Sequence, residues 1–455
     1  MSGNNGYKSN GSALNIPRKC DVVVIGGGPG GSGVATLLAK EGFDVILLEK
    51  DKFPRPQVGE SLLPQLWKFL DLLGVSEKIL QERFLAKSGG IIAWDDHVYQ
   101  VRFTEFGYTN PDRLGMHVER DIFDDILLKH AAECGARVFE EVSFVKADFS
   151  DSQWPVVSYM DKRGGSVYQG EIACRYVVDA SGYAAVLARQ FGTRKVVSEL
   201  SNYLGLWGYY KDSLYLGVDQ RSHPVSDAYQ VKPVTFVRDY QDGWIWHIIL
   251  RESASVGLVV NRGQMKGKGK QAQEAYLREV CATTPILRDL LVPATLIEGS
   301  MFFRPDYSYY SETVSGENYY LIGDAGGFVD PIFSQGVQAA LYNAAVSSIA
   351  ITASFQRESR RAFYSKIYEN QMLQYYGFAR LLALGDFGKA GVNADLVRSM
   401  MHMLPMNELE LTMAAATTTD RSGNLVRMAR EAGMFEKFGE GFGASKLVKV
   451  DQLAL

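Results

Sequence analysis

Apolar and polar residues follow one another along the first fifty positions in an order that predicts a strand, a helix and a second strand. Residues 21–25 are mostly apolar and β-branched, which is typical of a strand buried on both faces. Small residues follow at 26–31, and residues 32–41 have the composition of a helix. A second apolar run at 45–48 ends at Glu49. This order predicts a βαβ unit of a parallel sheet.

The turn between the first strand and the helix has the glycine spacing of a dinucleotide-binding motif. Its G-x-G-x-x-G pattern contains Gly26, Gly28, Pro29 and Gly31. Glycines at these positions allow a tight turn, close approach of the backbone to a pyrophosphate, and close packing of helix on strand. The helix N-terminus then faces the phosphates, and Glu49 can accept hydrogen bonds from ribose hydroxyls. We count the adjacent Lys50 among the cofactor-binding candidates; the unit alone does not separate FAD from NAD.

Composition excludes several classes of function. The chain has 455 residues, with 46% apolar and 22% charged residues, as in globular proteins of more than one ordinary core. A net charge of −4 lacks the excess of positive charge that is typical of nucleic-acid-binding proteins, and the apolar runs are too short for stable membrane insertion. The four cysteines lack CxxC spacing and the six histidines lack metal-ligand spacing, so we expect no metal site. We expect a cytoplasmic protein.

Two later strand patterns indicate that the dinucleotide is FAD. Residues 176–182 and 319–324 each run as a strand into a turn that carries a carboxylate, at Asp179 and Asp324. They resemble motifs of the para-hydroxybenzoate hydroxylase class of flavoproteins, in which the second Asp binds the ribityl chain. Two further segments also resemble this class. One is an amphipathic helix that begins near Arg120, and the other is the Gly-Glu-Ser sequence at 59–61. The resemblance implies further cofactor-binding residues, which are Gly59, Glu60, Ser61, Arg120, Asp179, Gly182, Asp324, Gly336 and Val337.

A tryptophan pair narrows the class further. The sequence Trp-Ile-Trp-His-Ile at 244–248 resembles the W-x-W-x-I-P signature of flavin-dependent halogenases, with Ile249 in place of proline. Alternate residues of a strand share a face, so Trp244 and Trp246 would form one aromatic wall. In the family this wall is thought to keep the organic substrate from the flavin and to suppress monooxygenation. The alternative is that both tryptophans belong to an ordinary core.

Two more segments extend the resemblance to the halogenases. Residues 328–336 match the family pattern F-x-x-P-x-x-S-x-G completely, which implies halide binding by Ser334, Gln335 and Gly336. A halide needs N–H donors at a positive helix end, and Asp330 would compete with it unless that side chain points away. Residues 84–90, Phe-Leu-Ala-Lys-Ser-Gly-Gly, resemble the stretch that carries the catalytic lysine, especially in the pyrrole and phenol branches. A lone lysine is more often a solvated surface residue.

The resemblance implies a halogenase that uses reduced FAD and O2 to convert chloride or bromide to hypohalous acid. The acid would pass the tryptophan wall to Lys87, which would present the halogen to an electron-rich indole, pyrrole or phenol, free or tethered to a carrier. The implied catalytic residues are Lys87, Ser334, Trp244 and Trp246. No second G-x-G-x-x-G occurs, so we expect a separate flavin reductase to supply the reduced FAD. The alternatives are an aromatic monooxygenase of the same fold, a geranylgeranyl-type prenyl reductase, and a binding protein without catalysis.

The chain is predicted to be α/β, with a Rossmann-type FAD-binding lobe, a β-sheet substrate lobe and a C-terminal helical region. The FAD lobe would lie within residues 19–355 and be discontinuous, at about 19–90, 113–195 and 296–355. Strand patterns at 234–237, 244–250 and 256–260 predict a substrate-side sheet at about 200–295. Residues 356–455 have helical spacing, and residues 1–18 have the composition of a disordered tail. Seven methionines between 400 and 434 favour core packing over a lid.

Overall fold

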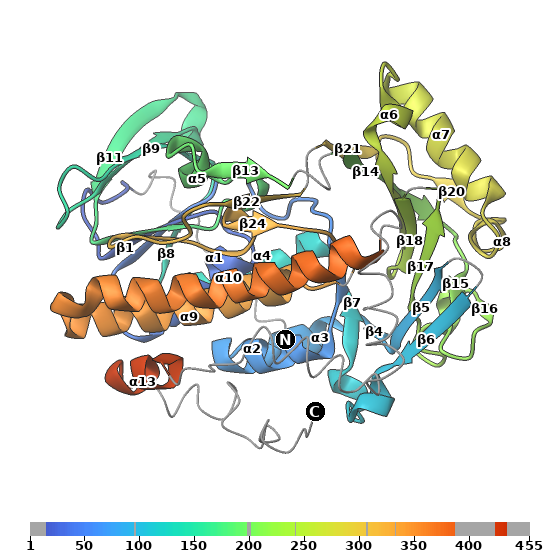
Figure 1. The fold of residues 1–455 in the computed structure, drawn as a ribbon, viewed down its shortest axis with the longest axis horizontal. Coiled ribbons are helices and arrows are strands. Elements are labelled where there is room, and N and C mark those ends of the chain that lie inside the picture. Colours follow the sequence, from blue (N-terminus) through green and yellow to red (C-terminus); the bar gives the residue numbers. More distant parts are fainter. Residues whose placement is uncertain are drawn as a thin grey trace, which may run out of the picture.

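The structure is a computed structural model and describes residues 15–94, 97–197, 202–241, 243–305, 308–332, 334–386 and 424–434. Its elements form two neighbouring halves, each built on a sheet (Figure 1). The half on the left carries a parallel sheet with long helices, and the half on the right carries a larger, mainly antiparallel sheet. This is the α/β architecture that the sequence predicts.

The parallel sheet has the strand order β23-β12-β1-β2-β8. Its strands are β1 (Val22–Ile25), β2 (Val45–Leu48), β8 (Arg137–Phe139), β12 (Tyr176–Asp179) and β23 (Tyr319–Leu321). Side chains of β1 alternate between two apolar cores, with Val22 and Val24 in one, Val23 and Ile25 in the other. Because both faces of the sheet are covered, its strands are apolar at nearly every position.

Helices cover one face of the parallel sheet. They are α1 (Pro29–Lys40), α4 (Arg120–Glu133), α9 (Gly336–Gln356) and α10 (Arg361–Asp386) (Figure 1). The start of α1 lies at Pro29, earlier than the predicted residue 32, because proline suits the first helical position with its fixed φ and missing N–H. A Cβ atom at Gly33 would lie 2.9 Å from Leu341 Cδ2, so this glycine permits the close packing of α1 on α9.

The second half contains a sheet of order β20-β14-β19-β18-β17-β5-β6, with β21 also paired to β14. Its strands are β5 (Gly89–Trp94), β6 (His97–Arg102), β14 (Tyr203–Lys211), β17 (Thr235–Tyr240), β18 (Gly243–Ile249), β19 (Ala254–Asn261), β20 (Thr295–Leu296) and β21 (Phe302–Pro305). The predicted strands at 234–237, 244–250 and 256–260 are β17, β18 and β19. The sheet also takes in β5, β6 and β21, which lie outside the predicted insert at 200–295, because sheet pairing joins strands that are distant in sequence.

Short elements complete the described chain. A sheet that matters for the site consists of β3 (Ser61–Leu62), β7 (Gly115–His117) and β4 (Leu85–Lys87). The other strands are β9 (Val142–Asp148), β10 (Val156–Asp161), β11 (Tyr168–Ala173), β13 (Arg194–Val196), β15 (Tyr215–Leu216), β16 (Ser222–His223), β22 (Tyr309–Ser311) and β24 (Gly327–Phe328). The other helices are α2 (Trp67–Leu73), α3 (Ser76–Glu82), α5 (Val186–Gln190), α6 (Arg262–Met265), α7 (Lys270–Thr283), α8 (Leu287–Leu290) and α13 (Asn424–Glu431).

The termini partly correct the predicted boundaries. Ile16 is buried, and the carbonyl of Arg18 accepts a hydrogen bond from the backbone N–H of Ala173 at 2.9 Å. Disorder is therefore the wrong prediction for residues 15–18, because an apolar side chain anchors them, while 1–14 lie outside the described residues. In the predicted helical region, Met428 and Met434 are buried in the core, and residues 387–423 and 435–455 lie outside the described residues. Among the described helices, none combines the length and apolarity that a membrane span requires.

Candidate active site

A cavity of about 620 Å³ is lined by residues from both halves of the molecule. Its size lies well within the range of about 300–1,000 Å³ for ligand pockets. The predicted site residues that line it are Gly26, Gly28, Pro29, Glu49, Lys50, Gly59, Glu60, Ser61, Arg120, Gly182, Trp244, Trp246, Asp324, Ser334, Gln335, Gly336 and Val337. The structure thus brings together segments that are more than three hundred positions apart in the sequence, such as those of Gly26 and Val337. Gly31, Lys87 and Asp179 do not line the cavity.

The glycine turn after β1 has the shape that a diphosphate needs. Gly26 has φ +102°, a conformation that favours glycine, and a Cβ atom at Gly31 would lie 1.8 Å from the carbonyl oxygen of Gly26. Gly31 therefore acts by letting α1 close on the turn, which explains its absence from the lining. The first N–H groups of α1 have no intrahelical partners and can bind an anion.

Glu49 lies at the end of β2, with only 5% of its surface exposed. One carboxylate oxygen accepts a hydrogen bond from the backbone N–H of Gly27 at 2.6 Å, and the other accepts one from the backbone N–H of Asp51 at 2.8 Å. Glu49 therefore holds the glycine turn in place and also lines the cavity. Lys50 is exposed and forms an ion pair with Asp51.

Asp179 supports the site from below. It is fully buried, and its two carboxylate oxygens accept hydrogen bonds from the backbone N–H groups of Ser181 at 3.0 Å and Leu187 at 2.8 Å. Both oxygens are thus committed to the turn that follows β12. The turn lines the cavity in place of Asp179, through Ala180, Ser181 and Gly182.

A buried ion pair fixes Arg120 at the start of α4. Its guanidinium group donates to both carboxylate oxygens of Asp124, at 2.8 and 3.0 Å, and to the carbonyl of Val58 at 2.9 Å. Arg55 donates to the same carboxylate at 3.0 Å. Sequence reasoning missed Asp124 and Arg55, although the i,i+4 spacing of Arg120 and Asp124 on a helix was a signal for the pair.

Two buried carboxyl groups lie at the cavity. Burial raises the pKa of Asp324 to about 6, and the charges of Arg304 and Arg120 oppose this shift. Burial also raises the pKa of Glu60, which accepts hydrogen bonds from the hydroxyl of Tyr209 at 2.5 Å and from the backbone N–H of Gly59 at 3.0 Å. Neither carboxyl group is a freely solvated anion in this environment.

The tryptophan wall lies on β18, as the sequence predicts. The ring centroids of Trp244 and Trp246 are 5.6 Å apart, and both rings line the cavity. Trp246 donates a hydrogen bond to the hydroxyl of Ser255 at 3.2 Å. Trp207 on β14 belongs to the same apolar cluster and was missed, because only its cross-sheet neighbours place it there.

Lys87 is buried beside the cavity, with 4% of its surface exposed, and so is not a solvated surface residue. Its ammonium group donates a hydrogen bond to the hydroxyl oxygen of Ser61 at 2.9 Å. The hydroxyl of Ser334 donates to the same oxygen at 3.0 Å. Ser61 therefore joins Lys87 to Ser334, two residues that the sequence singled out from separate motifs.

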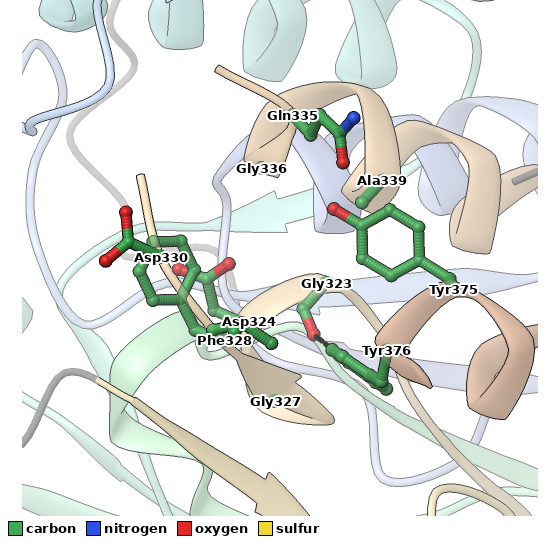
Figure 2. Close-up of a pocket in the computed structure, with 11 residues that line it drawn as sticks. Gly323, Asp324, Gly327, Phe328, Asp330, Gln335, Gly336, Ala339, Tyr375 and Tyr376 are labelled. Carbon is green, nitrogen blue, oxygen red and sulfur yellow. Dashed lines mark hydrogen bonds between the residues drawn. The ribbon is translucent and has the colours of Figure 1, made fainter. Parts of the chain in front are cut away.

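The segment before α9 turns its acidic residue away from the large cavity. Asp330 accepts a hydrogen bond from the backbone N–H of Ile332 at 2.9 Å and lines a separate cavity of about 30 Å³. Figure 2 shows Asp330 in this small cavity, across from Gln335, Gly336 and Tyr375. Asp330 does not line the large cavity, and the two cavities share Gln335 and Gly336 at the start of α9.

Comparison with known proteins identifies the family. The sequence model of the tryptophan halogenase family matches residues 21–112 and 107–384, which is most of the chain. The chain belongs to the tryptophan halogenase family. It is 32% identical over 370 residues to the tryptophan 2-halogenase of Chondromyces crocatus, and the alignment covers 80% of this chain and 67% of that protein. It is 33% identical over 382 residues to the flavin-dependent halogenase armH3 of Armillaria mellea, covering 79% and 73%.

Solved structures agree with this membership. The myxobacterial chondrochloren halogenase CndH matches with a TM-score of 0.74 and 28% identity, over 92% of this chain and 97% of that chain. The flavin-dependent halogenase CmlS matches with a TM-score of 0.69 and 26% identity, over 93% of this chain and 78% of that one. The chain is therefore a flavin-dependent halogenase that uses FAD and a halide, and the monooxygenase, prenyl-reductase and non-catalytic alternatives are set aside.

The residues of this halogenase fit FAD. The glycine turn has no side chain where a diphosphate would lie, Glu49 lines the cavity at the end of β2, and Asp324 lies just after β23 and beside α9. The structure also adds residues that the sequence did not single out, above all Thr235 on β17, whose hydroxyl lies 2.9 Å from that of Ser61. A polar residue at the start of an apolar strand was the signal for it.

Proposed function

We propose that this protein halogenates an electron-rich aromatic compound with hypohalous acid formed from chloride or bromide, and that Lys87 delivers the halogen. The observation that carries the proposal is the shared hydrogen bond at Ser61, which links the lysine to the segment at the start of α9. Three motifs from distant parts of the chain thereby meet beside the tryptophan wall. When bound and reduced, FAD supplies with O2 the two-electron oxidation of the halide.

The start of α9 is the proposed halide site. The backbone N–H of Ser334 donates to the carbonyl of Pro331 at 3.0 Å, and its hydroxyl donates to Ser61. The donors that remain for a halide are the first N–H groups of α9, at Gly336 and Val337, which have no intrahelical partners. This 21-residue helix also directs its positive dipole end toward the anion. In this arrangement Ser334 orients the loop, and Gln335 lines the cavity next to it.

Lys87 is suited to hold hypohalous acid near the substrate. Its ammonium group can donate a hydrogen bond to the acid's oxygen while another of its protons remains on Ser61. The aromatic carbon then forms a bond to the halogen, and the bond between halogen and oxygen breaks. The departing hydroxide takes up the proton lost from the ring, which gives the halogenated arene and water.

The tryptophan wall has a separate role in the proposal. Trp244 and Trp246 line the flavin cavity and are closely packed, so an aromatic substrate on the far side of them is kept from the flavin. Hypohalous acid is small enough to travel where the organic substrate is not. We propose a separate flavin reductase as the source of reduced FAD, and an indole, pyrrole or phenol, free or carrier-tethered, as the substrate.

The test is an aerobic assay with a generic flavin reductase, NADH, FAD and bromide. Indole, pyrrole and phenol probes are offered, and products are read by mass spectrometry for the bromine isotope doublet. Lys87→Ala is expected to abolish aromatic halogenation while a chemical trap still detects hypobromous acid. Lys129→Ala, at an exposed lysine on α4, is the matched control and is expected to behave as the unaltered protein. Normal product formation by Lys87→Ala would refute the lysine's role, and hydroxylated product independent of bromide would refute the reaction.

A further inference from the structure

A chain of buried hydrogen bonds extends from Lys87 away from the cavity. Beyond Ser61, the hydroxyl of Thr235 lies 2.9 Å from the hydroxyl of Ser61 and 2.9 Å from Nε2 of His117. His117 is fully buried, and Thr235 is 7% exposed. Ser61, His117 and Lys87 lie on the adjacent strands β3, β7 and β4, while Thr235 lies on β17 of the large sheet. The chain therefore joins the small sheet to the large one at the position of the lysine.

The donors and acceptors in this chain have a single consistent direction. A hydroxyl has one proton and two lone pairs, and Ser61 already accepts from both Lys87 and Ser334. Ser61 must therefore donate its proton to Thr235. Thr235 then has its own proton left for Nε2 of His117, which must present a lone pair.

His117 is therefore the neutral tautomer with its proton on Nδ1. Burial lowers the pKa of His117 well below its usual value, and the charge of Lys87 lowers it further, so the neutral form prevails. The backbone of Ile249 opposes this lowering of the pKa, and Nδ1 of His117 is buried without a hydrogen-bond partner among the described residues. Burial thus keeps His117 neutral, and its Nε2 remains the acceptor at the end of the chain of hydrogen bonds.

We propose that His117, acting through Thr235 and Ser61, is a positioning residue that holds Lys87 and Ser334 as donors to one oxygen. The inference rests on the proposed role of Lys87 and goes beyond it, since it assigns what orients the lysine. Without an acceptor at His117, the hydroxyl proton of Thr235 has no hydrogen-bond partner. The Thr235 hydroxyl can then rotate, and the hydroxyl of Ser61 loses its fixed orientation. Lys87 would then occupy several positions, and hypohalous acid would escape instead of reacting.

The test measures coupling, which is the amount of brominated aromatic product per hypobromous acid formed, with bromide and the phenol, indole and pyrrole probes. Thr235→Val removes one hydroxyl at nearly constant volume, and Thr235→Ser keeps it. His117→Leu removes the acceptor, and His117→Gln keeps an acceptor oxygen at a similar reach. FAD affinity, from quenching of flavin fluorescence, and urea denaturation are measured for all four variants as readouts independent of turnover.

Thr235→Val and His117→Leu are expected to lower coupling by about tenfold to a hundredfold, because a small misplacement of a reacting group has effects of that size. Thr235→Ser and His117→Gln are expected to keep their coupling within about twofold of that of the unaltered protein. FAD affinity is expected to be unchanged in both His117 variants, because His117 does not line the cavity. If His117→Leu does not fold, Thr235→Val tests the same link. Unchanged coupling in Thr235→Val, or equal losses in His117→Gln and His117→Leu, would overturn the positioning role. Coupled product from Lys87→Ala would instead overturn the proposed function.

Discussion

Gly257→Ala should displace the tryptophan wall, because Gly257 packs directly against Trp246. Gly257 lies on β19 directly opposite Trp246 of β18. A Cβ atom there would lie 2.2 Å from Cζ2 of Trp246 and 2.5 Å from Cβ of Trp207. Carbon atoms in contact prefer separations of about 3.5–4.0 Å. Because the second neighbour is next to the backbone, the added methyl group cannot be accommodated by moving one flexible side chain.

The expected cost follows from that geometry. Overpacking by a methyl group in a well-packed core costs about 1–3 kcal/mol. Replacement of glycine by alanine also lowers the conformational entropy of the unfolded chain, which stabilises the folded state by about 0.4–1 kcal/mol. We therefore expect Gly257→Ala to lower the free energy of unfolding by about 1–2 kcal/mol. Displacement of Trp246 should also reduce coupling and raise hydroxylated by-product.

Gly205→Ala is the matched control on neighbouring β14. A Cβ atom at Gly205 would have its nearest contact at 3.8 Å, to Cζ3 of Trp207, which is ordinary van der Waals contact. This control should be neutral or slightly stabilising. Both free energies of unfolding are measured by urea denaturation, followed by circular dichroism and tryptophan fluorescence. Equal values for Gly257→Ala and Gly205→Ala would refute the packing argument for the wall.

Two further predictions concern buried charge. The pKa of Asp324 is raised from 3.8 to about 6, so the stability that it contributes is full below about pH 4 and is lost as the pH rises through about 6. Without FAD, Asp324→Asn should therefore gain about 2 kcal/mol relative to the unaltered protein between pH 4 and pH 7 in urea denaturation, and a pH-independent difference would contradict this. Arg120→Gln leaves buried Asp124 with Arg55 alone, and should lower the free energy of unfolding by about 3 kcal/mol; a loss below about 1 kcal/mol would show that the pair is dispensable.

Local sequence determined much of the fold. The apolar runs of β1 and β2, the glycine turn between them and the helix that follows are all encoded within about thirty residues, so pattern and spacing sufficed. The same holds for β17, β18 and β19, whose alternation is local. Pairing of these strands with β5, β6 and β21 was not predictable, because it depends on contacts between distant segments.

Most of the site residues that the sequence motifs singled out line the cavity, because such motifs encode local turns and strand ends. They could not show what each residue contacts. Asp179 and Gly31 support the turns instead of lining the cavity, since backbone amides surround one and close packing requires the other. Asp330 faces the small cavity, because the loop before α9 turns its side chain aside.

By itself, the sequence determined that this chain has a βαβ cofactor unit, a tryptophan pair on one strand and a lysine within a halogenase-like segment. Only the tertiary structure decided that Ser61 would join Lys87 to Ser334, and that Thr235 and His117 would complete the chain. The physical reason is that a hydrogen bond depends on distances of about 3 Å between atoms, whereas these residues come from strands whose approach is set by packing of the whole molecule.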